Sequence, residues 1–149
     1  MATIYFDMDG TIANLYGVKN WLTYLRNYDV HPYAVAKPIY EISYLEIVIK
    51  KLKDMGYDIG IISYVAHNCT PEYAEAISRT KRNWLAHHFP FANPEKIHIT
   101  TKDIAKNTYY ESGDILVDDE LANLDNWSGD TINANKNIIW ELYKLTERN

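Results

Sequence analysis

The amino-acid sequence predicts an α/β fold, with a Rossmann-like three-layer arrangement around a parallel β-sheet. Short apolar runs recur along the chain and alternate with segments of helical periodicity, which is the pattern of strands joined by crossover helices. Parallel strands are covered on both faces, so they read as continuous apolar runs. The 149 residues fit one domain, 1–149.

Four apolar runs are expected to form strands. They cover residues 3–7, 57–63, 96–100 and 114–118, and each is rich in β-branched or aromatic residues. These four runs therefore predict the strands of the sheet.

Three segments have the periodicity of helices. Residues 38–55 begin at Pro38, a favoured first helical residue, and carry apolar residues at helical spacing. Residues 71–88 begin in the same way at Pro71. Residues 136–146 form a third apolar stripe, and we expect this helix to cover one face of the sheet.

One segment, residues 13–37, does not fit a simple strand-to-helix alternation. It follows the first predicted strand, and many of its residues are aromatic. Those aromatic residues are Tyr16, Trp21, Tyr24, Tyr28 and Tyr33. We predict a small helical cap inserted after the first strand.

Composition and charge exclude several classes of protein. The chain has 15 basic and 20 acidic residues, and its net charge of −5 disfavours general nucleic-acid binding. The one cysteine, Cys69, excludes an intrachain disulfide framework and favours a reducing compartment, so we expect a cytoplasmic protein. No apolar run reaches the roughly 18 residues of a membrane span. The first residues also lack the basic region of a secretory signal, so we expect no membrane partner.

The strongest chemical signal is the acid pair Asp7 and Asp9, followed by Gly10, at the end of the first predicted strand. Strand residues two apart lie on the same side, so both carboxylates can converge beyond the carboxyl edge of the sheet, where open α/β sheets bind ligands. Adjacent carboxylates repel unless a cation or protons neutralise them, and Mg²⁺ prefers oxygen ligands. The alternative is an Asx-type turn after the strand, without a ligand.

A second acid pair, Asp118 and Asp119, ends the fourth predicted strand, and Asn123 follows four residues after it. If the first and fourth strands are neighbours, four carboxylates meet at one edge of the sheet. The alternative is that these acids cap a short helix beginning near Glu120. Two independent acid pairs, each at the end of an apolar strand, favour a functional site.

Possible phosphate-binding groups follow the other two strands. Ser63 ends the second strand, where its hydroxyl could contact a phosphate oxygen, although an ordinary strand-end serine is the simpler interpretation. Lys102 follows the third strand directly, and Lys106 lies one turn further on. Lys81, on the 71–88 helix, is a third candidate, with a solvated position on the helix surface as its alternative.

Other patterns in the sequence are weaker signals of a functional site. His67 and Cys69 have metal-ligating side chains, but zinc spacing is absent, and we interpret them as part of a loop. The chain has no GxGxxG or P-loop sequence, which disfavours a dinucleotide cofactor or an NTP site of the kinase type.

In this order, the motifs resemble those of the haloacid dehalogenase-like hydrolases: D-x-D-G-T, a strand-end Ser or Thr, a Lys and a final acidic pair. Within that superfamily the chain looks most like the 5'(3')-deoxyribonucleotidases, through residues 7–17, 80–90 and 115–127. It departs from them at Leu15, where those enzymes carry an aromatic residue that contacts the base. The spacing between Lys102 and Asp118 is also longer, which leaves the phosphate lysine open between Lys102 and Lys106.

The resemblance implies a catalytic role for each acid. Asp7 would be the nucleophile that forms an aspartyl-phosphate, and Asp9 would be the general acid and then the general base. Mg²⁺ would be held by Asp7, the Asp9 carbonyl and Asp119, with Asp118 as the second choice.

It also implies how the substrate is bound. Ser63 and the lysine would bind the transferring phosphoryl group, assisted by the backbone N–H groups of Met8 and Asp9. In the cap, the residues that would contact the substrate are Leu15, Tyr16, Trp21 and Tyr24.

We therefore expect a Mg²⁺-dependent phosphatase for a small phosphorylated substrate, with a nucleoside or deoxynucleoside 5'-monophosphate as the best guess. One alternative is another small phosphoester, such as a sugar phosphate, or the 3'-phosphate of a nucleic-acid end. Another is a non-catalytic module that binds a phosphorylated ligand. The sequence leaves a homodimer open.

Overall fold

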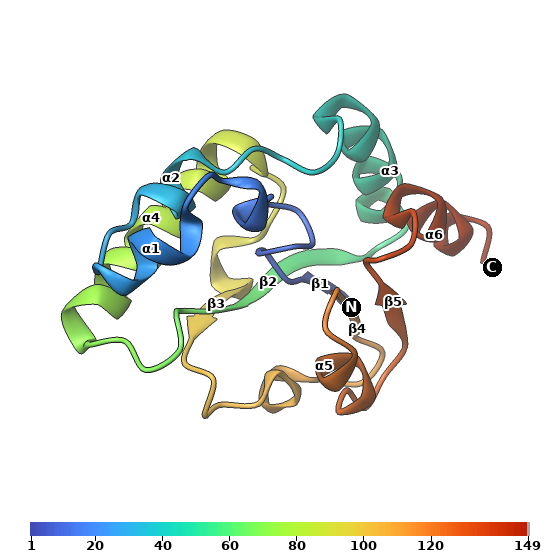
Figure 1. Ribbon diagram of the computed structural model, residues 1–149. Coiled ribbons are helices and arrows are strands. Elements are labelled where there is room, and N and C mark those ends of the chain that lie inside the picture. Colours follow the sequence, from blue (N-terminus) through green and yellow to red (C-terminus); the bar gives the residue numbers. More distant parts are fainter. Residues whose placement is uncertain (149) are drawn as a thin grey trace.

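The computed structural model describes residues 1–148, which form a parallel sheet with helices on both faces (Figure 1). The sheet has five strands in the order β3-β2-β1-β4-β5, which is that of a doubly wound, Rossmann-like sheet. The strands are β1 (Thr3–Phe6), β2 (Asp58–Tyr64), β3 (Ile97–Thr100), β4 (Ile115–Asp118) and β5 (Thr131–Asn133). The α/β class and the parallel sheet predicted from the sequence are confirmed.

The first and fourth strands lie side by side at the centre of the sheet. In their parallel register Ile4 is opposite Ile115 and Phe6 is opposite Val117. Beyond β1 the pairing continues for one more hydrogen bond, from Asp7 N to Val117 O at 2.9 Å. The residues that follow these two strands therefore emerge next to each other at the same edge.

The sequence analysis did not identify the fifth strand. β5 has only three residues at the edge of the sheet, and Ile132 is the buried one. A single apolar residue makes no run, so the local sequence carries no strand signal there.

Helices α3 (Ile42–Asp54), α4 (Pro71–His88) and α6 (Ile138–Thr146) supply one outer layer. In Figure 1, α3 and α4 lie above the sheet, with α6 beside α3. Their apolar stripes pack with one face of the central strands. Buried members of this core include Ile4, Phe6, Ile61, Val117, Leu45, Ile49, Leu52, Trp84, Leu85, Leu142 and Leu145.

The other face has a thinner cover. The short helix α5 (Leu121–Asp125) lies below the sheet in Figure 1. Tyr5, Ile62 and Leu116 form the sheet side of this core. Leu124 and Trp127 pack against them from outside.

The helix boundaries follow local hydrogen bonding. The predicted helix at 71–88 is confirmed as α4, with Thr70 Oγ1 accepting a hydrogen bond from Tyr73 N at the N-cap. The predicted helix at 38–55 begins too early, because Ile39 N donates to Ile12 O and the chain around Pro38 is extended beside Ala13. The third begins at Ile138 rather than at 136, with Asn137 as its cap.

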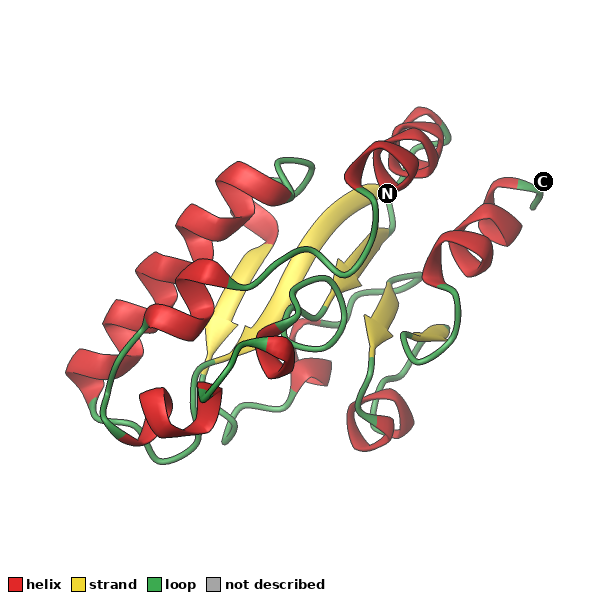
Figure 2. Cartoon of the chain, turned by 45° about the horizontal axis from the view of Figure 1, so that its top comes forward, coloured by secondary structure: helices red, strands yellow, loops and turns green. Residues whose placement is uncertain are grey.

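Residues 13–37 are largely helical. They form the 3₁₀ turn η1 (Leu15–Gly17) and the helices α1 (Trp21–Arg26) and α2 (His31–Val35). Figure 2 shows these short helices next to the long helix α4, beyond one end of the strands. We call residues 13–37 the flap.

Hydrogen bonds attach the flap to α4. Tyr73 Oη donates to Asp29 O at 2.8 Å, and Trp84 Nε1 donates to Ala36 O at 2.7 Å. Tyr33 and Leu15 from the flap are buried in an apolar cluster with Ile77 of α4. The flap is therefore packed on the body of the protein through α4.

Across residues 1–148, no helix has both the length and the apolar character that crossing a membrane requires.

Candidate active site

Asp7 and Asp9 lie in a tight turn that follows β1. The carbonyl of Met8 accepts hydrogen bonds from the N–H groups of Thr11, Ile12 and Ala13, each at 3.0 Å. Gly10 in this turn has φ +82°, a conformation that favours glycine. A Cβ at Gly10 would also overlap the carboxylate of Asp119, so glycine allows the two acid-bearing loops to approach closely.

The two acid pairs meet at the carboxyl edge of the sheet. Carboxylate oxygens of Asp7, Asp118 and Asp119 all lie within 4.8 Å of one another. Thr11 Oγ1 lies 3.2 Å from both Asp7 Oδ2 and Asp119 Oδ1 and links the two loops. The neighbouring strands β1 and β4 thus bring three of the four expected carboxylates together, whereas the Asp9 carboxylate pairs with Lys81.

Lys106 connects Asp7 with Asp118. It begins the 3₁₀ turn η3 (Lys106–Tyr109) in the connection between β3 and β4, and its side chain is 2% exposed. Its Nζ donates to Asp7 Oδ1 at 2.8 Å and to Asp118 Oδ2 at 2.7 Å. Of the two lysines left open by the sequence, Lys106 is the one at the carboxylates.

Lys102 lies at the rim of the site instead. Its side chain is exposed and lines the cavity, and within the described residues it forms no ion pair. Lys102 comes soon after β3 and stays at the surface. The chain returns to the carboxylates only at Lys106, whose ammonium contacts Asp7 and Asp118.

Lys81 is a buried member of the site, so the alternative of a solvated helix position is wrong. Its side chain is 1% exposed. Its Nζ donates to Asp9 Oδ2 at 2.8 Å, to Ser63 Oγ at 2.7 Å and to Tyr64 O at 2.7 Å. Ser63, at the end of β2, is fully buried behind this ammonium.

The opposing effects of burial and charge give the acids different pKa values. Burial acts to raise the pKa of Asp7, but the Lys106 ammonium outweighs it and holds this pKa below its usual value. Burial raises the pKa of Asp9 above its usual value, and Lys81 offsets this only in part. Asp7 is therefore the more readily ionised acid of the first pair.

The second acid pair is shifted upward. Burial and the Asp7 carboxylate raise the pKa of Asp118 to about 6, and the same causes raise that of Asp119 to about 7. Burial opposes the charge of Lys106, but Asp7 and Asp118 together raise the pKa of this ammonium above its usual value. The protein's own cations thus leave Asp119 insufficiently neutralised near neutral pH.

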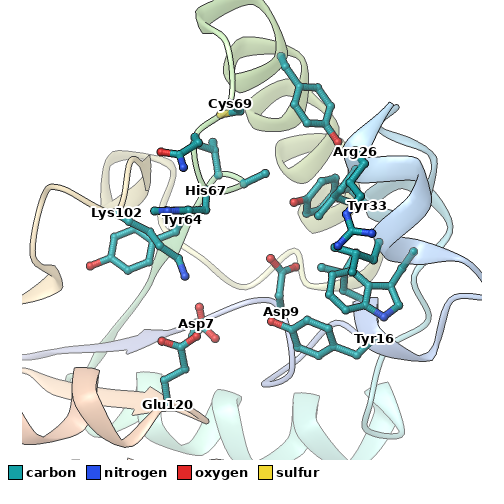
Figure 3. Close-up of a pocket in the computed structure, with 18 of the residues that line it drawn as sticks. Asp7, Asp9, Tyr16, Arg26, Tyr33, Tyr64, His67, Cys69, Lys102 and Glu120 are labelled. Carbon is teal, nitrogen blue, oxygen red and sulfur yellow. The ribbon is translucent and has the colours of Figure 1, made fainter. Parts of the chain in front are cut away.

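A cavity of about 520 Å³ opens above Asp7 and Asp9. Figure 3 shows these carboxylates at its floor, with Tyr16, Tyr33 and Arg26 along one side and Tyr64, His67 and Lys102 along the other. The first side belongs to the flap and its neighbours, and the second to the chain that follows β2 and β3. The acids are therefore accessible from a pocket with aromatic walls.

Three of the four flap residues expected at the substrate line this cavity. They are Leu15, Tyr16 and Trp21, and the Tyr16 and Trp21 rings meet edge to face with centroids 5.0 Å apart. Tyr24 does not line the cavity, because its ring packs against His31 at 4.8 Å. Tyr24 belongs to the other face of α1.

Other lining residues were not singled out from the sequence. Arg26, at the end of α1, has no local pattern that distinguishes it from surface residues, and Tyr64 differs only by its place at the end of β2. His67 and Cys69, interpreted as loop residues, do lie in the loop after β2 and line the cavity. A strand-end position was the only available signal, and it applied to Tyr64.

Backbone donors and an amide complete the site. In the part of the chain that is described, no protein acceptor pairs with the backbone N–H of Met8 or of Asp9. The Met8 side chain itself is buried in the core. Asn123, four residues beyond Asp119, donates from Nδ2 to Asp118 Oδ2 at 3.1 Å.

A scan against protein-family models and a search of curated proteins both give no match for this chain.

Proposed function

We propose that this protein is a Mg²⁺-dependent phosphomonoester hydrolase that acts through an aspartyl-phosphate, with nucleoside or deoxynucleoside 5'-monophosphates as its substrates. One observation carries the proposal: Asp7 lies at the floor of the cavity, with Lys106 Nζ 2.8 Å from one oxygen and Thr11 Oγ1 3.2 Å from the other. An ionised, oriented carboxylate at the base of a pocket is what nucleophilic attack requires.

Asp7 is the proposed nucleophile. Its lowered pKa supports an ionised carboxylate at neutral pH. In the first step an Asp7 oxygen bonds to phosphorus while the phosphorus–oxygen ester bond breaks. The electron pair of that bond stays on the leaving oxygen, which takes a proton and departs as an alcohol.

Asp9 is the proposed proton donor for this step. Burial raises its pKa, the direction that favours proton donation, and it lines the cavity two residues from Asp7. In the second step the Asp9 carboxylate takes a proton from the water that attacks the phosphorus of the aspartyl-phosphate. That attack releases phosphate and restores the Asp7 carboxylate.

The carboxylates of Asp7 and Asp119, with the backbone carbonyl of Asp9, are the proposed Mg²⁺ ligands. Oxygen donors suit this hard cation, and a cation bound here would relieve the burial and the repulsion from Asp7 that raise the pKa of Asp119 to about 7. Asp118 is the weaker candidate, because its oxygens already accept from Lys106, Asn123 and Glu120 N. The bound cation would neutralise charge on the phosphoryl oxygens.

The phosphoryl group would be bound by Lys106 and by the backbone N–H groups of Met8 and Asp9. Lys106 lines the cavity, and within the described residues the two N–H groups have no protein acceptor, which supports their use as donors where negative charge develops. Ser63 is fully buried and does not line the cavity, so it has no direct contact with the phosphoryl group in this proposal and instead accepts a hydrogen bond from Lys81.

We propose that the flap is the cap of this enzyme and that its aromatic side chains contact a nucleobase. The supporting observation is that Tyr16 and Trp21 face the same cavity as the acids. The cavity volume of about 520 Å³ is within the range of small-molecule sites. Together with the order of the motifs, this supports membership of the haloacid dehalogenase-like hydrolases, near the 5'(3')-deoxyribonucleotidases.

Phosphate release from a substrate panel tests the proposal. The panel contains 5'- and 3'-deoxynucleoside monophosphates, a sugar phosphate, p-nitrophenyl phosphate and an oligonucleotide with a 3'-phosphate, each with Mg²⁺ and with EDTA. We expect Mg²⁺-dependent turnover that is greatest for the 5'-monophosphates. Turnover of the oligonucleotide alone would point to end processing, and binding without turnover would reject an enzyme.

A further inference from the structure

Lys81 is a buried cation whose hydrogen bonds are all made within the protein. Its side chain is 1% exposed, and its ammonium reaches Asp9 Oδ2, Ser63 Oγ and Tyr64 O at 2.7–2.8 Å. An ammonium has three N–H donors, so these contacts use all of them. Lys81 is also absent from the residues that line the cavity. It therefore acts on a substrate only through a residue that it contacts.

The contact with Asp9 distinguishes the two oxygens of that carboxyl group. Oδ2 is held by Lys81, whereas Oδ1 has no hydrogen-bond partner among residues 1–148. The Asp9 side chain is 18% exposed and lines the cavity. Lys81 thus restrains one oxygen from behind and leaves the other to the cavity.

Stability alone does not account for this arrangement. Removing two charges from water costs several kcal/mol per ion, and a buried ion pair is often no more stabilising than apolar residues of the same size. Here the cost falls on a residue directly beside the proposed reaction centre. The lysine comes from the rigid helix α4, while Asp9 lies in a loop next to Gly10.

We infer that Lys81 is a positioning residue: by holding Asp9 Oδ2 it directs Oδ1 toward the leaving-group oxygen of the substrate. The inference rests on the proposed phosphomonoester hydrolysis and deepens it. In that reaction Asp9 serves proton transfer and Asp7 serves bond formation to phosphorus. Lys81 should therefore raise the rate for substrates whose leaving oxygen needs a proton, and should have little effect on the rate for substrates whose leaving oxygen does not.

The flap contributes to the same arrangement. The ring of Tyr33, from α2, lies over the Lys81 ammonium with 5.1 Å between Nζ and the ring centroid. This ring also lines the cavity. Tyr33 therefore separates the buried ammonium from the cavity on the flap side.

The test compares leaving groups. Lys81→Met keeps the length of the side chain and removes its charge. An alkyl phosphomonoester needs a proton on its leaving oxygen, whereas p-nitrophenyl phosphate releases a stable phenolate. We expect kcat to fall about 100-fold for the alkyl ester and less than about fivefold for the aryl ester, in line with the size of general-acid effects. KM should change little for either.

Three further variants complete the experiment. Arg79→Met removes a positive charge from an exposed position of the same helix and serves as the matched control. Comparing the single variant Asp9→Asn with the double variant Asp9→Asn, Lys81→Met tests whether Lys81 acts through Asp9. Since the double variant leaves no unpaired buried charge, it remains informative if Lys81→Met does not fold. We expect both to have the same kcat on p-nitrophenyl phosphate.

The outcomes are distinguishable. Equal losses on the two esters, or a further loss in the double variant, overturn the positioning role while the proposed function stands. If the unmodified protein hydrolyses no phosphomonoester with Mg²⁺, the proposed function fails and the positioning role fails with it.

Discussion

Lys106, in the connection between β3 and β4, meets Asp7, which follows β1, with 2.8 Å between Nζ and Oδ1. They are 99 positions apart in the chain. The same ammonium lies 2.7 Å from Asp118 Oδ2, so a single buried cation links the ends of β1 and β4. This link neutralises part of the negative charge around Asp7, the proposed nucleophile, and holds its carboxylate in place at the cavity.

Replacing Asp7 by Asn should abolish turnover. The amide has nearly the same shape but is a poor nucleophile, so we expect kcat to fall by at least about a thousandfold, as for other nucleophile replacements. Phosphate release measures this loss. Circular dichroism on the same preparation serves as the folding control, and near-normal turnover by a folded Asp7→Asn protein would refute the aspartyl-phosphate.

Replacing Lys106 by Met should impair both stability and activity. The carboxylates of Asp7 and Asp118 would lose their common partner, and breaking a buried ion pair costs about 3–5 kcal/mol. Urea unfolding measures the stability, and kcat/KM measures the activity. Lys50→Met, at an exposed position of α3, is the matched control. If Lys106→Met unfolds at the same urea concentration as Lys50→Met, the buried link has no energetic role.

The apparent affinity for Mg²⁺ should weaken as the pH falls below about 7. The pKa of Asp119 is raised from 3.8 to about 7, so protons compete with the cation for this carboxylate in that range. We expect the Mg²⁺ concentration for half-maximal turnover to rise on going from pH 8 to pH 6. In Asp119→Asn this half-maximal Mg²⁺ concentration should be higher at every pH and should depend much less on pH. A similar effect of Asp118→Asn with none of Asp119→Asn would reverse the ligand assignment.

The same shift predicts how stability varies with pH in EDTA. A carboxyl whose pKa is raised in the folded state binds more protons there than in the unfolded chain between pH 3.8 and about 7. Its contribution to the free energy of unfolding therefore decreases as the pH rises through that window. Thermal unfolding of Asp119→Asn, compared with the unmodified protein, should show a weaker decrease between pH 5 and pH 7. Parallel curves would contradict the shift.

Gly10→Ala should lower turnover more than a substitution that introduces only the same backbone strain. Gly10 has φ +82°, and a Cβ there would meet the Asp119 carboxylate. Gly56→Ala is a matched control, because its φ is +104° but no atom lies within 4 Å of the new Cβ. We expect each to lose about 1–2 kcal/mol of stability, and only Gly10→Ala to lose turnover by about tenfold or more. Equal activity of the two variants would show that activity does not depend on the close approach of the Gly10 turn to the Asp119 carboxylate.

Trp21→Ala should raise the KM for nucleotides more than the KM for small phosphoesters. Loss of the ring removes about 1–3 kcal/mol of contact with a stacked base, which corresponds to a KM increase of roughly five- to a hundredfold. The KM for p-nitrophenyl phosphate should change less. Tyr44→Ala, at an exposed position of α3, is the control. Equal increases for both substrates would mean that the flap does not select a base.

Local sequence was sufficient for the framework of the fold. Apolar runs predicted four of the strands, and the helix at 71–88 was predicted with its observed limits. It was insufficient where long-range pairing decides a boundary. Pro38 favours a helix start by itself, but residues 37–39 pair with residues 12–14, and α3 begins only at Ile42. β5 likewise exists because β4 offers it an edge.

The positions of the acids were determined by sequence, and their partners were determined by tertiary structure. Asp7, Asp9, Asp118 and Asp119 follow apolar strands, and the carboxyl ends of parallel strands necessarily share one edge of a sheet. A lysine has a long, flexible side chain that is normally solvated, so sequence position says little about where its ammonium lies. Only the packing of α4 and η3 against that edge buries Lys81 and Lys106 and leaves Lys102 in solvent.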